Sequence, residues 1–243
     1  MEILAIIPAR KNSKGISLKN IQKLNGIPLL EYTIKAAKNS KKISRIILTT
    51  DSEEFADIGK KLKVEVPFIR PKKLATDNAS SLDVVNHVLT FLKKNENYQP
   101  DIILILQVTS PLRTSLTIDK SINLLKKTNS TSVLGVSEIK QNPSLAFILQ
   151  NNNFLKPFNK NFKSFKQRQK LPKFYYPTGS IYTFWRKTLE TSGNFYGSKI
   201  KSLIIPNEES IDVDDIFDLF ICENILKNWK NYKKTFLKRS VKV

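Results

Sequence analysis

The chain has 243 residues, 40% of them hydrophobic, and 41 Lys and Arg against 21 Asp and Glu give a formal net charge of +20. This length accommodates one sizeable α/β domain, and no apolar run reaches the roughly 18 residues of a membrane span. A single cysteine, Cys222, and a single histidine, His87, exclude an intrachain disulfide and multi-histidine zinc sites. Because the chain opens on a strand pattern without a signal peptide, we expect a cytoplasmic protein.

Short apolar runs predict strands at residues 3–7, 46–50, 64–66, 102–106, 132–136, 181–184 and 203–205. Between most of them, apolar residues at helical spacing predict helices at residues 28–37, 53–62, 82–94, 115–126 and 214–229. Strands that alternate with helices are typical of parallel βαβ units. The predicted fold is therefore a three-layer α/β sandwich with a mainly parallel sheet.

Residues 140–176 interrupt this alternation and are rich in Asn, Lys and Phe. We therefore expect an α/β domain made of residues 1–139 and 177–243, with residues 140–176 inserted in it. Aromatic side chains outside the regular pattern indicate apolar surface that needs a partner, and a plain surface insertion is the alternative. These aromatic residues are Phe147, Phe154, Phe158, Phe162 and Phe165.

The first predicted strand runs into a loop with cations at Arg10, Lys11, Lys14 and Lys19 and one glycine, Gly15. At the carboxyl end of a first parallel strand, such a loop lies where open α/β sheets bind ligands. Its charges suit a polyphosphate. The loop lacks both common glycine-rich nucleotide patterns, so a basic surface loop is the alternative.

Two acids near the end of the chain form a candidate metal site. Asp212 and Asp214 alternate along an extended segment, so both carboxylates project to one face. Oxygen ligands of this kind suit Mg²⁺, or Mn²⁺ in its place, which takes one or two protein carboxylates. The pair could instead cap the following helix, and Asp215 is typical of an acid in a first helical turn.

Six strings of residues occur in a characteristic order over nearly the whole chain. They are Ile7-Pro8-Ala9-Arg10 with Ser13-Lys14-Gly15-Ile16 and Lys19-Asn20, Arg70-Pro71 with Leu74-Ala75-Thr76-Asp77 and Ser80-Ser81, Leu106-Gln107-Val108-Thr109-Ser110-Pro111-Leu112-Arg113, Arg168-Gln169 with Leu171-Pro172, Pro177-Thr178-Gly179-Ser180-Ile181-Tyr182, and Ser210-Ile211-Asp212-Val213-Asp214. Together they resemble the N-acylneuraminate cytidylyltransferases, which make CMP-activated nine-carbon acidic sugars from CTP. The resemblance implies a Rossmann-like nucleotide-diphospho-sugar transferase fold and a homodimer in which residues 140–176 reach into the neighbouring active site.

The resemblance also implies roles for individual residues. The nucleotide site would comprise Arg10, Ser13, Lys14, Gly15, Lys19, Asn20, Arg70, Asn78, Ser80 and Ser81, with Ser80 or Ser81 equally a candidate helix cap. The sugar site would comprise Gln107, Thr109, Ser110, Arg113, Arg168, Gln169, Phe195 and Tyr196, with Arg168 contributed by a partner chain. Asp212 and Asp214 would hold the metal and, with Arg10 and Lys19, carry catalysis, since charge neutralisation and positioning dominate such transfers.

The implied substrates are CTP and a nine-carbon acidic keto-sugar of sialic, legionaminic or pseudaminic type. In sialic acid enzymes a Lys follows the Pro of the insertion by two positions, whereas Pro143 is followed here by Ser144 and Leu145, so the sugar stays open. Alternatives are a 3-deoxy-manno-octulosonate cytidylyltransferase, a pyrophosphorylase for a sugar 1-phosphate, and a non-enzymatic module that binds polyanions through residues 230–242. No zinc-finger or aromatic recognition motif is present, and we expect neither nucleic acid nor a membrane as partner.

Overall fold

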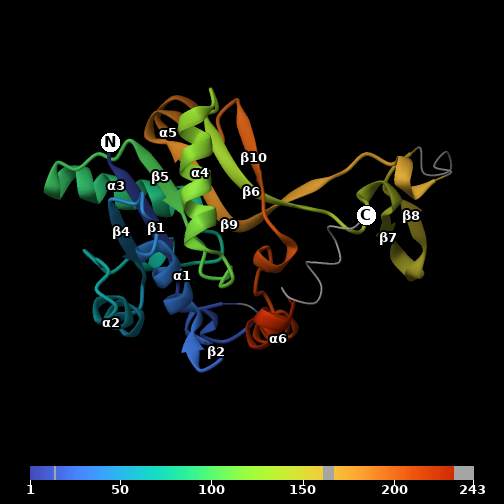
Figure 1. The fold of residues 1–243 in the computed structure, drawn as a ribbon, viewed down its shortest axis with the longest axis horizontal. Helices are drawn as coiled ribbons and strands as arrows, with labels where there is room; N and C mark the ends of the chain where they lie inside the picture. Colours follow the sequence, from blue (N-terminus) through green and yellow to red (C-terminus); the bar gives the residue numbers. More distant parts are fainter. Residues whose placement is uncertain (14, 161–166, 233–243) are drawn as a thin grey trace.

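The computed structural model describes residues 1–13, 15–160 and 167–232. At its centre the described residues form a six-stranded sheet in the order β10-β6-β9-β5-β1-β4 (Figure 1). The strands are β1 (Ile3–Pro8), β4 (Arg45–Thr49), β5 (Ile102–Ile105), β6 (Ser132–Glu138), β9 (Tyr175–Trp185) and β10 (Ile200–Ile204). All neighbours pair in parallel except β9, which runs antiparallel to both β5 and β6.

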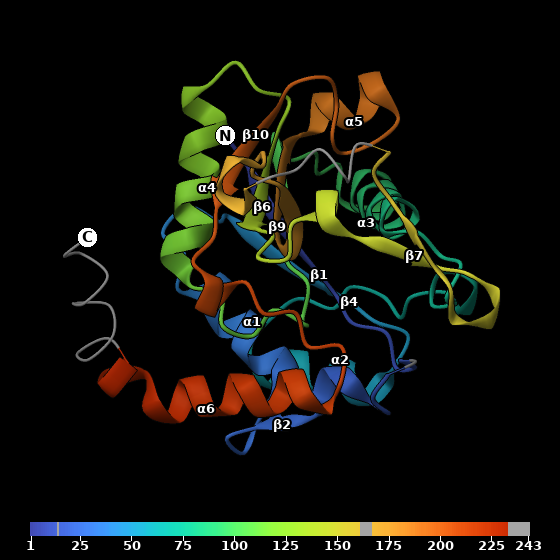
Figure 2. The ribbon, with the colours of Figure 1, turned by 90° about the vertical axis from the view of Figure 1, so that its right-hand side faces the viewer.

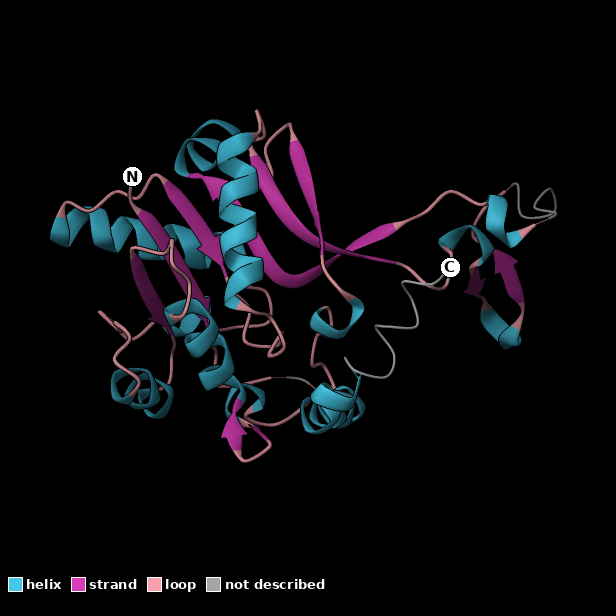
Figure 3. Ribbon diagram, in the orientation of Figure 1, coloured by secondary structure: helices cyan, strands magenta, loops and turns pink. Residues whose placement is uncertain are grey.

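Helices cover both faces of the sheet because its strands are apolar on both sides. Along β1, Ile3, Ala5 and Ile7 belong to one buried cluster, whereas Leu4 and Ile6 belong to the other. The first cluster contains residues of α1 (Leu29–Lys38), α2 (Glu53–Lys61), α4 (Ser115–Lys127) and α6 (Ile216–Tyr232). The second contains residues of α3 (Ser81–Glu96) and α5 (Arg186–Ser192). The result is the predicted three-layer sandwich, seen edge-on in Figure 2 and by element type in Figure 3.

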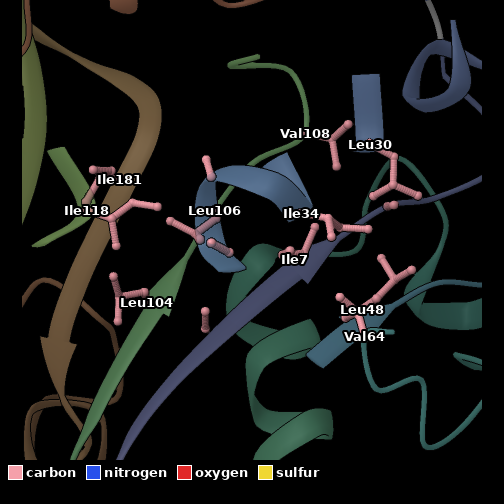
Figure 4. Close-up of a cluster of buried hydrophobic side chains, with 14 of the residues drawn as sticks. Ile7, Leu30, Ile34, Leu48, Val64, Leu104, Leu106, Val108, Ile118 and Ile181 are labelled. Carbon is pink, nitrogen blue, oxygen red and sulfur yellow. The ribbon is translucent and has the colours of Figure 1, made fainter. Parts of the chain in front are cut away.

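The first cluster is the larger of the two and joins helix to sheet. Figure 4 shows how Ile7 of β1 lies beside Ile34 of α1, with Leu104 and Ile118 further along the same layer. These side chains are at most 1% exposed, and burying each aliphatic side chain of this size contributes roughly 1.5–3 kcal/mol to folding. The packing fixes β1 and β5 rigidly, and with them the loops that follow their carboxyl ends.

Three local features differ from the sequence-based prediction or add to it. The strand predicted at residues 64–66 is reduced to a single bridge between Ile47 and Glu65. Helix α5 was not predicted, since its seven residues show little periodicity. A short hairpin joins β2 (Lys23–Leu24) to β3 (Ile27–Pro28). Its turn residues Asn25 and Gly26 both have positive φ, as the favoured two-residue hairpin turn requires.

The segment between β6 and β9 stands apart from the sandwich (Figures 1 and 3). A long β6–β9 ribbon, in which Glu138 pairs with Tyr175, leads out to it. There β7 (Phe147–Leu149) and β8 (Leu155–Pro157) form an antiparallel hairpin, accompanied by short 3-10 helices at Pro143–Leu145, Asn151–Asn153 and Arg168–Lys170. Phe154 is 70% exposed and Leu149 66%. Phe162 and Phe165 lie outside the described residues.

The strand order locates the binding crevice. From β1 the chain passes to β4 on one side, and β5 then pairs with β1 on the other side. The carboxyl ends of β1 and β5 therefore form a topological switch point, where open α/β sheets bind ligands. No helix within the described ranges is long and apolar enough to cross a membrane.

Candidate active site

A cavity of about 540 Å³ opens at the carboxyl ends of β1 and β5. This volume is in the range of small-molecule sites. Four stretches of chain line it: the loop after β1, the segment that leads into α3, the residues after β5, and the segment before α6. The lining includes these predicted site residues: Arg10, Ser13, Gly15, Lys19, Asn20, Arg70, Ser81, Gln107, Thr109 and Asp214.

The loop after β1 is fastened at two points. The buried side chain of Asn20 donates from Nδ2 to the carbonyl of Arg10 at 2.8 Å, which closes the loop on itself. At Gly15 the loop lies directly against the segment before α6, because a Cβ at this position would lie 2.2 Å from the carbonyl oxygen of Asp214. Only glycine fits this close approach, so the loop and Asp214 are held as one unit.

Two ion pairs cross the cavity. Arg10 Nη1 lies 2.8 Å from an oxygen of Asp77, and Lys19 Nζ donates to Asp214 Oδ1 at 2.9 Å. The Asp214 side chain is 76% exposed and that of Asp77 45%. The side chains of Arg10 and Lys19 are 34% and 13% exposed, so each pair is open to solvent mainly on its carboxylate side, where screening by water weakens it. Both cations can therefore exchange a carboxylate for a phosphate oxygen at small cost.

Arg70 has a different environment. It is 4% exposed, yet its Nε and Nη2 have no hydrogen-bond partner among the described residues. Burial lowers the pKa of Arg70, and the charge of Asp51, whose Oδ1 lies 3.8 Å from Nη2, partly offsets this. Buried donors are nearly always paired. Because Arg70 lines the cavity, an acceptor on a ligand would complete its hydrogen bonds.

The acids before α6 divide into two roles. The Asp215 carboxylate accepts from the amide of Asp218 at 2.9 Å, and the Asp218 carboxylate accepts from the amide of Asp215 at 3.1 Å. This reciprocal arrangement caps the helix. The alternative that Asp212 and Asp214 act as the cap is therefore wrong, and Asp215, expected in the first turn, stands at the cap position.

Asp212 is suited to a cation. Burial raises the pKa of its carboxyl, whereas a hydrogen bond from Thr109 lowers it. Its Oδ1 is buried without a hydrogen-bond partner among the described residues. No group of three or more His, Cys, Asp or Glu that could hold a metal occurs in that part of the chain. Two carboxylates, one with an orphaned oxygen, fit a hard divalent cation that keeps most of its waters.

Two residues that were predicted to bind the sugar have structural roles instead. Arg113 is 4% exposed, and its guanidinium donates to the carbonyls of Gln107 and Ser180 and to the Thr33 hydroxyl. Ser110 is fully buried, and its hydroxyl donates to the carbonyl of Thr178 at 3.4 Å. The predictions that Arg113 and Ser110 bind the sugar are therefore wrong, since both side chains are enclosed by backbone.

The choice between Ser80 and Ser81 as helix cap is also resolved. Ser80 accepts from the amide of Asp83 at 3.1 Å, and the Asp83 carboxylate accepts from the amide of Ser80 in return. Ser80 is thus the cap of α3, which corrects its prediction as a nucleotide ligand, and Ser81 lines the cavity. Asn78 is exposed and lies between two lining residues without belonging to the lining.

The remaining predicted residues lie elsewhere. Gln169 is exposed on the segment between β6 and β9, called here the protruding unit. There it lines a small pocket with Glu138 and Lys173 and does not line the main cavity. Phe195 is 9% exposed and packs against Phe184 and Tyr182, and Tyr196, 38% exposed, lies against Phe195. The rings of Phe195 and Tyr196 do not line the main cavity. Tyr182 lies opposite Ile105 in the pairing of β9 with β5, and Ile105 lines the cavity. Lys14 and the side chain of Arg168 lie outside the described residues.

Sequence reasoning missed Asp77. It belongs to one of the matched strings but was given no role, and the structure pairs it with Arg10. An acid next to Thr76 and Asn78 carries no local signal of this kind. Only the fold brings it to the cationic loop.

A cationic loop that meets Asp214 at a switch point is typical of nucleotide-binding transferases of the α/β class. The family model described as "Cytidylyltransferase" matches residues 4–203. The chain belongs to this family and is a nucleotidyltransferase. The predicted family, fold class and enzyme class are thereby confirmed.

Similarity to individual proteins extends over almost the whole chain. The chain is 34% identical over 231 residues to a CMP-N,N'-diacetyllegionaminic acid synthase of Legionella pneumophila, covering 93% of this chain and 97% of the relative. It is 30% identical over 228 residues to a pseudaminic acid cytidylyltransferase of Campylobacter jejuni, covering 93% and 97%. A solved CMP-2-keto-3-deoxy-manno-octonic acid synthetase in complex with CTP superposes with a TM-score of 0.69 over 94% of this chain and 100% of the other, at 13% identity. The last likeness is one of fold.

Proposed function

We propose that this enzyme transfers CMP from CTP to a hydroxyl group of a nonulosonic acid and releases pyrophosphate. The observation that carries the proposal is one cavity lined both by the cations Arg10, Lys19 and Arg70 and by Asp214. Relatives of nearly the same length carry names for this reaction. With CTP as donor and a single cysteine, we place the enzyme in the cytoplasm.

The nucleotide half of the reaction uses the loop after β1. Arg10 and Lys19 bind the phosphates, one as a bidentate fork and the other as a point charge. On binding, each leaves a carboxylate, Asp77 or Asp214, for a phosphate oxygen. Arg70 donates to the nucleotide from the cavity wall, where its buried donors require an acceptor. These groups align the α-phosphate and neutralise the leaving pyrophosphate.

Asp212 and Asp214 would hold Mg²⁺ or Mn²⁺. When bound, the cation supplies charge stabilisation at the reacting phosphate. Asp214, which pairs with Lys19 when no ligand is bound, would then bind the cation, and Lys19 would be left to bind a phosphate oxygen. Thr109 keeps the Asp212 carboxylate oriented through its hydrogen bond.

Gln107 and Thr109 face the acceptor sugar, since both line the cavity just beyond β5. Tyr196 offers an exposed ring beside the strand that carries Tyr182. A pyrophosphate-release assay with CTP, UTP and GTP tests the proposal. The acceptors are legionaminic, pseudaminic, N-acetylneuraminic and 3-deoxy-manno-octulosonic acids and a sugar 1-phosphate. Release with CTP and a nine-carbon acid supports it. Release only with the eight-carbon acid, only with a sugar 1-phosphate, or with none of them contradicts it.

We also propose that the protein is a homodimer, built through the hairpin β7–β8. Two observations support this: the hairpin residues Leu149 and Leu155 are paired and 66% and 60% exposed, and Gln169 lies on the protruding unit, outside the lining of its own chain's cavity. A second copy would cover the hairpin and receive Gln169 and Arg168 at its sugar site.

Light scattering of the double variant Leu149→Glu with Leu155→Glu tests the dimer. We expect a monomer with little activity, and Lys156→Glu on the same hairpin, where a charge is already exposed, serves as the matched control. A dimer of unchanged stability in the double variant would contradict the proposal.

A further inference from the structure

The guanidinium of Arg113 is enclosed and joins three separate elements. Nη1 donates to the carbonyl of Ser180 at 2.6 Å and to that of Gln107 at 3.1 Å. Nη2 donates to the Thr33 hydroxyl at 2.8 Å and again to the carbonyl of Gln107. Gln107 follows β5, Ser180 lies in β9 and Thr33 in α1. One side chain therefore fixes the end of β5 against two neighbours.

A buried charge is expensive unless hydrogen bonds and an opposite charge compensate it. Burial lowers the pKa of Arg113 to about 9, and the negative charge of Asp212 opposes that shift. A neutral residue of similar length would fill the space without this cost. The guanidinium is therefore better explained by what its fork arranges than by stability.

The two backbone carbonyls that Arg113 binds belong to two different segments near the candidate site. Gln107 lines the cavity on the side assigned to the sugar. Ser180 follows Gly179, whose φ is +72° and where a Cβ would lie 3.3 Å from Asp212 Oδ2. The bonds of Arg113 thus fix the position of Gln107, which is assigned to the sugar, relative to Ser180, whose neighbour Gly179 lies beside Asp212.

We propose that Arg113 is a positioning residue for the transfer reaction: it holds Gln107 and the Gly179–Ser180 stretch of β9 in register, so that acceptor sugar and Asp212 face the same phosphate. This inference rests on the proposed function for its catalytic consequence. Misplacement of a reacting group by about 1 Å costs on the order of a hundredfold in rate. Arg113 therefore affects turnover and sugar use without touching either substrate.

The test removes a partner of Arg113 rather than Arg113 itself. Thr33 is 1% exposed in α1 and lines no part of the cavity. Thr33→Val therefore keeps its shape and deletes the 2.8 Å bond from Nη2, together with the longer 3.4 Å bond from the Thr33 hydroxyl to the carbonyl of Gln107. The matched control is Thr183→Val, which deletes an equally buried hydroxyl contact, the 2.8 Å bond to Ser121, without involving Arg113. Arg113→Lys keeps the charge and removes the fork.

Two readouts decide the matter. Amide hydrogen exchange in peptides that contain Gln107 and Ser180 should rise at least threefold in Thr33→Val and stay unchanged in Thr183→Val. The comparison is made under conditions in which the two variants have lost the same amount of melting temperature. In steady-state assays, Thr33→Val should lower kcat about three- to tenfold and raise the KM for the sugar, with the KM for CTP within twofold of wild type. Arg113→Lys should show the same split with a larger drop in kcat.

Three outcomes would overturn the inference: unchanged exchange at both peptides, equal kinetics in Thr33→Val and Thr183→Val, or a parallel rise in the KM of CTP. A wild-type protein without turnover on any nonulosonic acid would refute the proposed function instead. The exchange comparison would still decide whether Arg113 holds the two segments in place.

Discussion

Replacing Gly15 with alanine tests whether the cationic loop must rest on the segment that carries Asp214. The new Cβ would lie 2.2 Å from the carbonyl oxygen of Asp214, whereas non-bonded heavy atoms are comfortable only beyond about 3.2 Å. The perturbation that this variant introduces is the steric conflict with Asp214.

The magnitude follows from this gap. The loop and Asp214 must separate by about 1 Å, which lengthens the 2.9 Å contact between Lys19 and Asp214 to a distance without a hydrogen bond. A displacement of this size at a reacting group costs on the order of a hundredfold. We expect kcat/KM for CTP to fall about a hundredfold. Because residue 15 is exposed, the melting temperature should change little.

The assay is pyrophosphate release at varied CTP, with Ser17→Ala as the matched control. Ser17 lies in the same loop, is exposed and lines no part of the cavity, so its variant should behave as wild type. If Gly15→Ala kept kcat/KM within threefold of wild type at an unchanged melting temperature, the contact with Asp214 would have no part in positioning the loop.

Three further predictions concern single side chains. Asp212→Asn and Asp214→Asn should each lower turnover by orders of magnitude over a Mg²⁺ titration, whereas Asp215→Ala should lose about 1 kcal/mol of stability and keep its turnover; near-wild-type rates in both Asn variants would refute the metal site. Arg10→Ala or Lys19→Ala should weaken CTP binding about ten- to a hundredfold in calorimetry, and unchanged affinity in both would assign the loop to structure alone. Burial raises the pKa of Cys222 to about 12, so iodoacetamide should modify it at pH 8 only in the unfolded chain, and equal rates in both states would contradict its burial.

The local pattern of the sequence determined the layered architecture and most of the loop chemistry. Apolar runs at β1 and β5 and helical spacing in α3 and α4 produce the sandwich because each element must bury its own apolar faces. The loop from Arg10 to Asn20 follows β1 directly, so its place at the sheet edge follows from chain order. The prediction that Asp212 and Asp214 hold a metal came from their alternation along an extended segment together with the family resemblance.

Tertiary structure decided which of these side chains meet. Lys19 and Asp214 are 195 residues apart and lie in contact, while Arg113, close in sequence to Gln107, turns inward to backbone carbonyls instead of the cavity. Ser80 and Ser81 are chemically alike, and only the start of α3 makes one a cap and the other a lining residue. Residue type specifies what a side chain can bind, but its partner depends on the packing of distant elements, which no local pattern encodes.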